Sequence, residues 1–102
     1  MNKRTLAKIL KPMKGIRVEN MVSNQGNIIA NQFIIYTPSG SIFQSYNTII
    51  TIKSFGEKTI LDRDSWDYSV TTGKYRNQFL NEGIAETRKK IKTGEYILAD
   101  LN

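Results

Sequence analysis

The chain has 102 residues, of which 39% are hydrophobic, so it is long enough for one domain with a modest core and too short for two. It contains no histidine and no cysteine, which excludes serine–histidine triads, thiol nucleophiles, disulfides and the usual transition-metal sites. No apolar run approaches the roughly 18 residues that a membrane-spanning helix requires. We therefore expect a non-catalytic, cytoplasmic protein with no metal, no cofactor and no membrane association. The alternative of an enzyme stays open, because Asp62, Asp64 or Asp67 could do acid–base work in a pocket with Lys74 or Tyr68.

The formal net charge of +6 is concentrated at the start of the chain. Six basic residues precede the first acidic residue, Glu19, and the remaining nine basic and nine acidic side chains cancel. The six are Lys3, Arg4, Lys8, Lys11, Lys14 and Arg17. Such a segment attracts phosphate backbones or acidic surfaces through a field that salt screens. The alternative interpretation is a basic extension that serves solubility alone.

The charge distribution suggests that residues 1–26 form a basic arm and residues 27–102 a single α+β domain. Within the arm, Thr5–Leu10 has apolar residues at helical spacing, which predicts a short amphipathic helix. Ile16–Val22 is compatible with a short strand or with an irregular segment leading into the domain.

A hairpin is predicted next. Ile28–Thr37 is rich in β-branched residues, Pro38–Gly40 supplies a turn, and Ser41–Lys53 is long enough to be the central strand of a sheet. Strict alternation gives this central strand two faces. The expected core face carries Ile42, Tyr46, Ile50 and Ile52. The opposite face carries Phe43, Ser45 and Asn47, either packed against a helix or open as a binding surface.

A third strand is expected at Thr59–Asp62, followed by a polar run that is rich in carboxylates. The three carboxylates of this run are Asp62, Asp64 and Asp67. A calcium loop needs regularly alternating oxygen donors and a sharp glycine turn, and neither is present in this run. Helix capping and hydrogen bonds within turns are the preferred explanation.

The last third of the chain predicts two short helices and a final strand. The candidate N-caps of the first helix are Ser69, Thr71 and Thr72, and the helix ends at Leu80, with Tyr75, Phe79 and Leu80 facing inward. Its expected outer face carries Lys74, Arg76, Asn77 and Gln78, side chains that suit phosphates and base edges as well as plain solvent. The second helix starts at Asn81 and ends at Gly94, a natural C-cap, and its last turns hold Arg88, Lys89, Lys90 and Lys92. The final strand spans Tyr96–Leu101.

These elements predict an α+β fold. A three- to four-stranded antiparallel sheet would carry the two helices on one face, with a basic N-terminal arm or short helix attached. A helix-turn-helix is disfavoured, because the second helix has too few apolar residues to brace a bundle.

Four segments resemble a family of small proteins encoded by bacteriophages and related mobile elements. They are NQFII (Asn31–Ile35), FQSYNTII (Phe43–Ile50), WDYSVTTGKYRNQFL (Trp66–Leu80) and TRKKIKTGEYILADLN (Thr87–Asn102). The resemblance covers roughly residue 27 to the end of the chain. That family is one of unknown function, so the resemblance implies an accessory protein that acts inside a bacterium, and it supplies no catalytic residues.

The function expected from these observations is binding to nucleic acid, DNA or RNA, or to a host nucleoprotein complex. The N-terminal cations would form one basic patch, and the cations of the two helices a second. The second patch comprises Lys74, Arg76, Arg88, Lys89, Lys90 and Lys92. The alternative is an anti-defence inhibitor of the anti-CRISPR type, which would bind a host effector protein such as a CRISPR effector.

Overall fold

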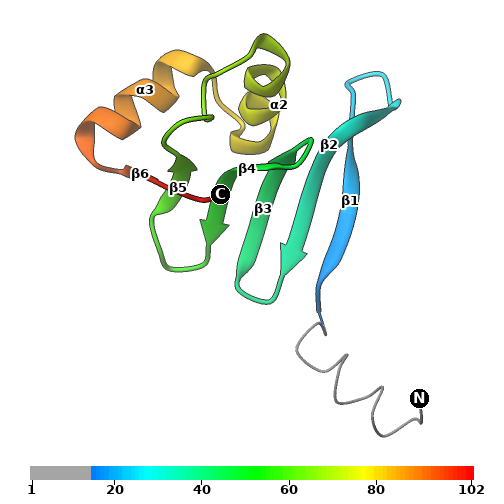
Figure 1. The fold of residues 1–102 in the computed structure, drawn as a ribbon, viewed down its shortest axis with the longest axis horizontal. Helices are drawn as coiled ribbons and strands as arrows, with labels where there is room; N and C mark the ends of the chain where they lie inside the picture. Colours follow the sequence, from blue (N-terminus) through cyan, green and yellow to red (C-terminus); the bar gives the residue numbers. More distant parts are fainter. Residues whose placement is uncertain (1–14) are drawn as a thin grey trace, which may run out of the picture.

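The computed structural model describes residues 15–102, in which one sheet carries two helices on one of its faces (Figure 1). The strands are β1 (Arg17–Val22), β2 (Ile28–Thr37), β3 (Gly40–Ser45), β4 (Thr48–Ser54), β5 (Thr59–Asp62) and β6 (Tyr96–Ala99). They lie side by side in sequence order. The first five form an antiparallel meander, and β6 pairs with β5 in parallel. The connection from β5 to β6 contains helices α2 (Val70–Leu80) and α3 (Ile84–Thr93).

The α+β class with two helices is confirmed, and β1 to β5 pair antiparallel as expected, whereas the predicted number of strands and the direction of the last strand are wrong. The sheet has six strands and is mixed. Ser41–Lys53 is not one central strand, because the chain reverses at Tyr46, which has a φ of 55°. Gln44 Nε2 donates to the Tyr46 carbonyl oxygen at 2.7 Å and holds this turn, so that Ser45 pairs with Thr48.

The predicted basic arm is not supported. The predicted helix Thr5–Leu10 lies outside the residues that the structure describes, as do Lys3, Arg4, Lys8, Lys11 and Lys14. The strand interpretation of Ile16–Val22 is confirmed, since Arg17 begins β1 and pairs with Tyr36 of β2. The folded sheet therefore starts about ten residues before the boundary expected at residue 27.

The helices cover the face that carries Phe43, which confirms the helix-packed alternative for that face, whereas the face with Ile42 and Ile52, expected to form the core, stays open. Phe43 is fully buried, and its ring stacks on Phe79 of α2 with centroids 5.8 Å apart. Ser45 is also buried, and its hydroxyl lies 2.9 Å from the hydroxyl of Thr72. Ile42 and Ile52 point to the opposite, open face, because they alternate with these buried residues. A register shift between Phe43 and Gln44 places adjacent residues 50 and 51 of β4 both in the core.

Local chemistry sets the ends of the helices, and all of the expected ends except the start of the second helix are confirmed. Ser69 is the N-cap of α2, and its hydroxyl accepts from the Thr72 N–H at 3.1 Å. Asn81 closes α2 in the left-handed conformation, so it does not begin the second helix, which starts at Ile84. Gly94 is the C-cap of α3 with a φ of 82°. Within residues 15–102, neither helix has the length and apolarity needed to cross a lipid bilayer.

A buried carboxylate attaches α3 to the last strand. Glu82 accepts hydrogen bonds from Lys90 Nζ at 2.7 Å, from the Tyr96 hydroxyl at 2.7 Å and from Thr87 Oγ1 at 2.6 Å. Burial by itself would raise the pKa of Glu82, but these hydrogen bonds outweigh burial and lower the pKa. Burial and the hydrogen bond to Glu82 raise the pKa of Tyr96 to about 12.

The Glu82 cluster predicts that stability falls at both ends of the pH range. The pKa of Glu82 is lowered on folding, so its stabilisation is present above its unfolded pKa of 4.5 and is lost as pH falls through the folded value. The pKa of Tyr96 is raised on folding, so its stabilisation is present below pH 10 and is lost as pH rises towards about 12. Urea denaturation across pH should show both losses.

Two variants separate the two ends. Glu82→Gln should reduce the loss on the acid side and Tyr96→Phe the loss on the alkaline side, because each removes one titrating group, while Asp62 and Lys90 keep part of each loss. Glu86→Gln, at an exposed position of α3, is the matched control and should keep the wild-type profile. An acid limb unchanged in Glu82→Gln would show that Glu82 does not contribute to it.

Candidate nucleic-acid interface

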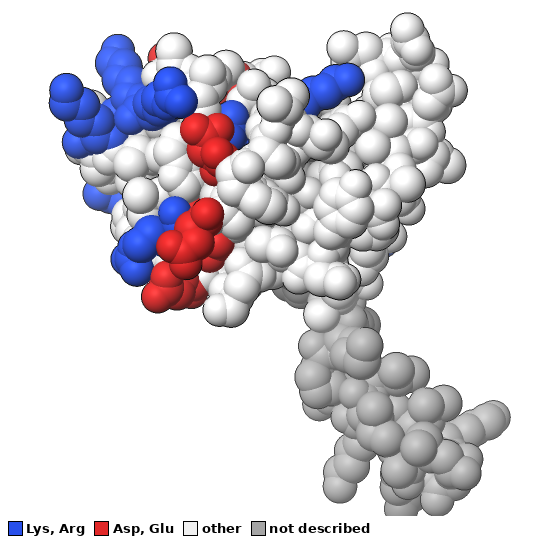
Figure 2. Space-filling view, turned by 45° about the horizontal axis from the view of Figure 1, so that its top comes forward, with Lys and Arg blue, Asp and Glu red and all other residues white. Residues whose placement is uncertain are grey.

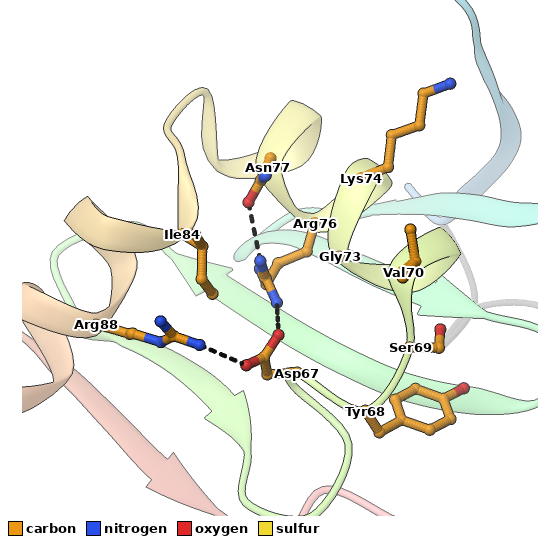
Figure 3. A pocket seen from close by; sticks show the side chains of 10 residues that line it. All are labelled: Asp67, Tyr68, Ser69, Val70, Gly73, Lys74, Arg76, Asn77, Ile84 and Arg88. Atoms are coloured by element: carbon orange, nitrogen blue, oxygen red, sulfur yellow. Dashed lines mark hydrogen bonds and ion pairs between the residues drawn. The ribbon is translucent and has the colours of Figure 1, made fainter.

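An open depression lies where the loop before α2 meets α2 and α3 (Figure 3). Its volume is about 790 Å³. The loop contributes Asp67, Tyr68 and Ser69, and the helices contribute the remaining lining residues. These are Val70, Gly73, Lys74, Arg76, Asn77, Ile84 and Arg88. Three of the lining side chains are cationic and one is anionic, so the depression has a positive balance.

Asp67 joins the two helices at the wall of this depression. Its Oδ1 lies 3.3 Å from Nη1 of Arg76 in α2, and its Oδ2 lies 3.3 Å from Nη2 of Arg88 in α3. The close view shows the carboxylate between the two guanidinium groups, with Arg88 on one side and Tyr68 on the other (Figure 3). One carboxylate facing two guanidinium groups leaves an excess of positive charge beside the depression.

Arg76 does not lie on the outer face of α2, where the sequence placed it. It is 1% exposed, because it follows Thr72 by one turn and precedes Phe79 by three residues on the buried side of the helix. Its Nη1 donates to the Trp66 carbonyl oxygen at 2.5 Å, and its Nη2 donates to Asn77 Oδ1 at 2.9 Å. Arg76 is therefore held by internal contacts.

Lys90 also makes internal contacts. Its Nζ lies 2.7 Å from Glu82 and 3.7 Å from Glu95, and its side chain is largely covered. Hydrogen bonding to Glu82 raises the pKa of Lys90 and keeps the ammonium charged. Among the six cations expected in the second patch, Arg76 and Lys90 thus serve the fold.

The other four cations of the predicted patch are exposed. Arg88, Lys89 and Lys92 lie on α3 and are called the α3 patch below, and Lys74 lies on α2 across the depression. Among residues 15–102, no ion pair involves Lys74, Lys89 or Lys92. Figure 2 shows Lys and Arg side chains gathered at the end of the molecule that carries α3. Arg17 lies apart from them on the edge strand β1, paired with Glu19 at 2.9 Å.

Two further exposed side chains border the depression, and neither was assigned to the nucleic-acid interface from the sequence. Tyr68 is 53% exposed and Val70 is 91% exposed. The local signal that could have pointed to this site is a tyrosine directly before the helix N-cap Ser69 in a cation-rich chain. Exposure itself is a tertiary property, so the pattern alone did not separate Tyr68 from core aromatics.

Two of the three carboxylates, Asp62 and Asp67, have structural contacts, and the hydrogen bond between Asp62 and Ser65 is a turn contact of the kind predicted from the sequence. Asp62 is buried and accepts from the Ser65 hydroxyl and from the Leu101 N–H, the latter at 2.9 Å. Burial would raise the pKa of Asp62, but these hydrogen bonds lower it. Within residues 15–102, no group of three or more metal-ligating side chains is placed to hold an ion.

The sequence profile of a family of unknown function, DUF8033, matches residues 16–96. The chain belongs to this family. The DUF8033 match starts at β1 and includes both helices, so it extends further towards the N-terminus than the resemblance noted from the sequence. The expected membership of an uncharacterised family is confirmed, and the bacteriophage origin stays a prediction. No curated protein and no solved structure matches the chain.

Proposed function

We propose that this DUF8033 protein is a non-catalytic binder of nucleic acid, alone or within a nucleoprotein complex. The observation that carries the proposal is the α3 patch, a set of exposed cations within about one turn of helix beside a depression with an exposed tyrosine. The proposed context, taken from the family resemblance, is an accessory protein of a phage or mobile element in the bacterial cytoplasm.

The charges of the α3 patch suit a phosphate backbone. Arg88 and Lys92 are one helical turn apart, and Lys89 adjoins them, so the three cations face a common region of solvent. Lys92 lies in the last turn, where the helix dipole also favours a cation. The dipole does not account for Arg88 and Lys89, which lie further from the C-terminal end. Arg88 pairs with Asp67, so Lys89 is the cation that neither the dipole nor an ion pair explains, and contact with phosphate would account for it.

The depression next to the α3 patch adds a surface for an unpaired base. The ring of Tyr68 is accessible, and aromatic rings that border a cationic surface stack bases of single-stranded nucleic acid. Lys74 supplies a further charge on the opposite wall. The proposed ligand is therefore single-stranded DNA or RNA in preference to a regular duplex.

Removing two charges of the α3 patch should weaken binding and lower its dependence on salt. In Lys89→Gln/Lys92→Gln, two phosphate contacts are lost, so the slope of log affinity against log salt should fall by about 1.4 and affinity by about tenfold at low salt. Arg88 is left in place because it also holds Asp67. Fluorescence anisotropy with single-stranded DNA, single-stranded RNA and duplex DNA measures both quantities.

The matched control is Arg17→Gln/Arg63→Gln. It removes the same charge from exposed residues that are each paired with a carboxylate, Glu19 and Asp100, away from the depression. Its affinity should stay close to that of wild type. Equal losses of affinity in the two double variants would show that binding depends on net charge alone and not on the α3 patch. If the wild-type chain bound none of the three ligands at low salt, the proposal would be refuted. Capture of a host protein that survives nuclease treatment would favour the alternative, a protein target.

A further inference from the structure

The face of the sheet that the helices leave open carries one β-branched aliphatic residue from each strand in a continuous row. Neighbours in this row are direct partners in the strand register, so their side chains lie together on the same face. The row, called the aliphatic ladder below, consists of Val18, Ile35, Ile42, Ile52, Ile60 and Ile97.

The aliphatic ladder is accessible to solvent along its length. Val18 and Ile97, at its two ends, are 59% and 43% exposed, and the four residues between them are partly exposed. Phe33 and Ile49 belong to the next row on the same face, since each is a register partner of Gln44. The open face is thus a continuous apolar surface, and contiguous exposed apolar surfaces mark interaction sites more often than single apolar residues do.

The strands present no exposed charge on this face within residues 15–102. Arg17, Glu19 and Lys53 alternate with ladder residues and therefore lie on the helix-covered side. Lys53 confirms this placement, because its Nζ donates to the Phe79 carbonyl oxygen of α2 at 2.8 Å. Asp62 is buried and hydrogen-bonded within the chain. Nucleic acid and anionic membranes need cations, and the described strands present none on the open face.

We infer that this face packs against the same face of a second copy of the chain. In a twofold dimer each residue near the axis meets its own equivalent, so a chain with a net charge of +6 needs an uncharged surface to associate with itself. The aliphatic ladder meets this condition. Two twisted sheets pack face to face about 10 Å apart with interdigitated side chains, and β-branched rows suit that packing.

The available area is sufficient for a specific dimer. Six strands about 4.8 Å apart and about five residues long, at about 3.3 Å per residue, give roughly 500 Å² of sheet per copy. The pair would then bury about 1,000 Å² in total, the lower limit for a specific interface. We therefore expect a dimer of moderate affinity. The helices of both copies would lie on the outside, so the α3 patch stays accessible and the inference does not depend on the proposed function.

The test measures the molar mass of the full chain by sedimentation from micromolar to several hundred micromolar protein, at high salt so that bridging by nucleic acid is screened. Wild type should approach twice 11.7 kDa. Ile52→Lys places like charges opposite each other across the axis and should shift the chain to a monomer with an unchanged circular dichroism spectrum. Ile42→Thr/Ile52→Thr keeps β-branched residues in the strands and should weaken the dimer at least tenfold.

Val70→Lys is the matched control, because Val70 is 91% exposed on the helix side and lies off the ladder. This variant should dimerise like wild type. A wild-type chain that stays monomeric over the whole concentration range would overturn the inference. A dimer that persists unchanged in both ladder variants would overturn it as well, because its contact would then lie on another surface.

Discussion

Gly40→Ala is expected to abolish the native fold, or to lower the free energy of unfolding by more than about 3 kcal/mol. Gly40 begins β3 where it lies against the end of β4, with a φ of 155°. A Cβ atom there would lie 1.9 Å from the Lys53 carbonyl oxygen and 2.8 Å from the Ser54 Cα atom. Both are backbone atoms of the neighbouring strand, so they cannot yield without breaking the β3–β4 pairing.

Gly56→Ala is the matched control for this prediction. Gly56 has a φ of 77°, and no atom lies within 4 Å of the position of its Cβ. Only the left-handed backbone conformation is then penalised, by about 1–2 kcal/mol. Urea denaturation followed by circular dichroism compares the two variants. Equal stability would contradict the close approach of β3 and β4 at Gly40.

Arg76→Met should lower the free energy of unfolding by about 3 kcal/mol. The side chain is replaced by an apolar one that fills part of the same space, while the Trp66 carbonyl oxygen and the Asn77 amide lose their buried partner. Asp67 keeps its ion pair with Arg88 but loses its ion pair with Arg76, which connects the loop to α2. The Cζ atom of Arg76 lies 5.4 Å from the ring centroid of Trp66, the single tryptophan, so tryptophan fluorescence reports unfolding at this contact directly.

Arg63→Met provides the comparison for Arg76→Met. Arg63 pairs with Asp100 at 3.2 Å, but both side chains are more than half exposed. An exposed ion pair contributes about 0–1 kcal/mol, so this variant should remain close to wild type. If the two methionine variants unfold at the same urea concentration, the contacts of Arg76 do not stabilise the fold in the way described.

Local features of the fold were predictable because neighbouring residues determine them. The cap at Ser69 and the left-handed Gly94 follow from side-chain and backbone preferences that act within one turn. The turn at Tyr46 escaped prediction because it contains no glycine or proline and interrupts a run of strand-forming residues. The parallel partner of β6 was also missed, since pairing across a long connection leaves no mark in the local pattern.

The candidate site was predictable in part. The sequence correctly identified α3 as the cation-rich helix. It placed both Arg76 and Lys89 in the binding patch, although Arg76 is buried and Lys89 is exposed. The rotation of a helix about its own axis depends on the sheet beneath it, and that sheet was assigned the wrong core face. Ile42 and Ile52 were placed together correctly, but alternation cannot say which of two apolar faces a helix will cover.

The connectivity of the sheet has a consequence for the order in which the chain folds. From β1 to β5 each strand pairs with its predecessor across a short turn, so this meander can form early by local hairpin closure. The sheet face that carries Phe43 and Leu61 becomes buried only when the two helices dock on it. The connection from β5 to β6 contains both helices, so β6 can align with β5 only after the helices have taken their places. We therefore expect capture of β6 to be the slow, late event of refolding.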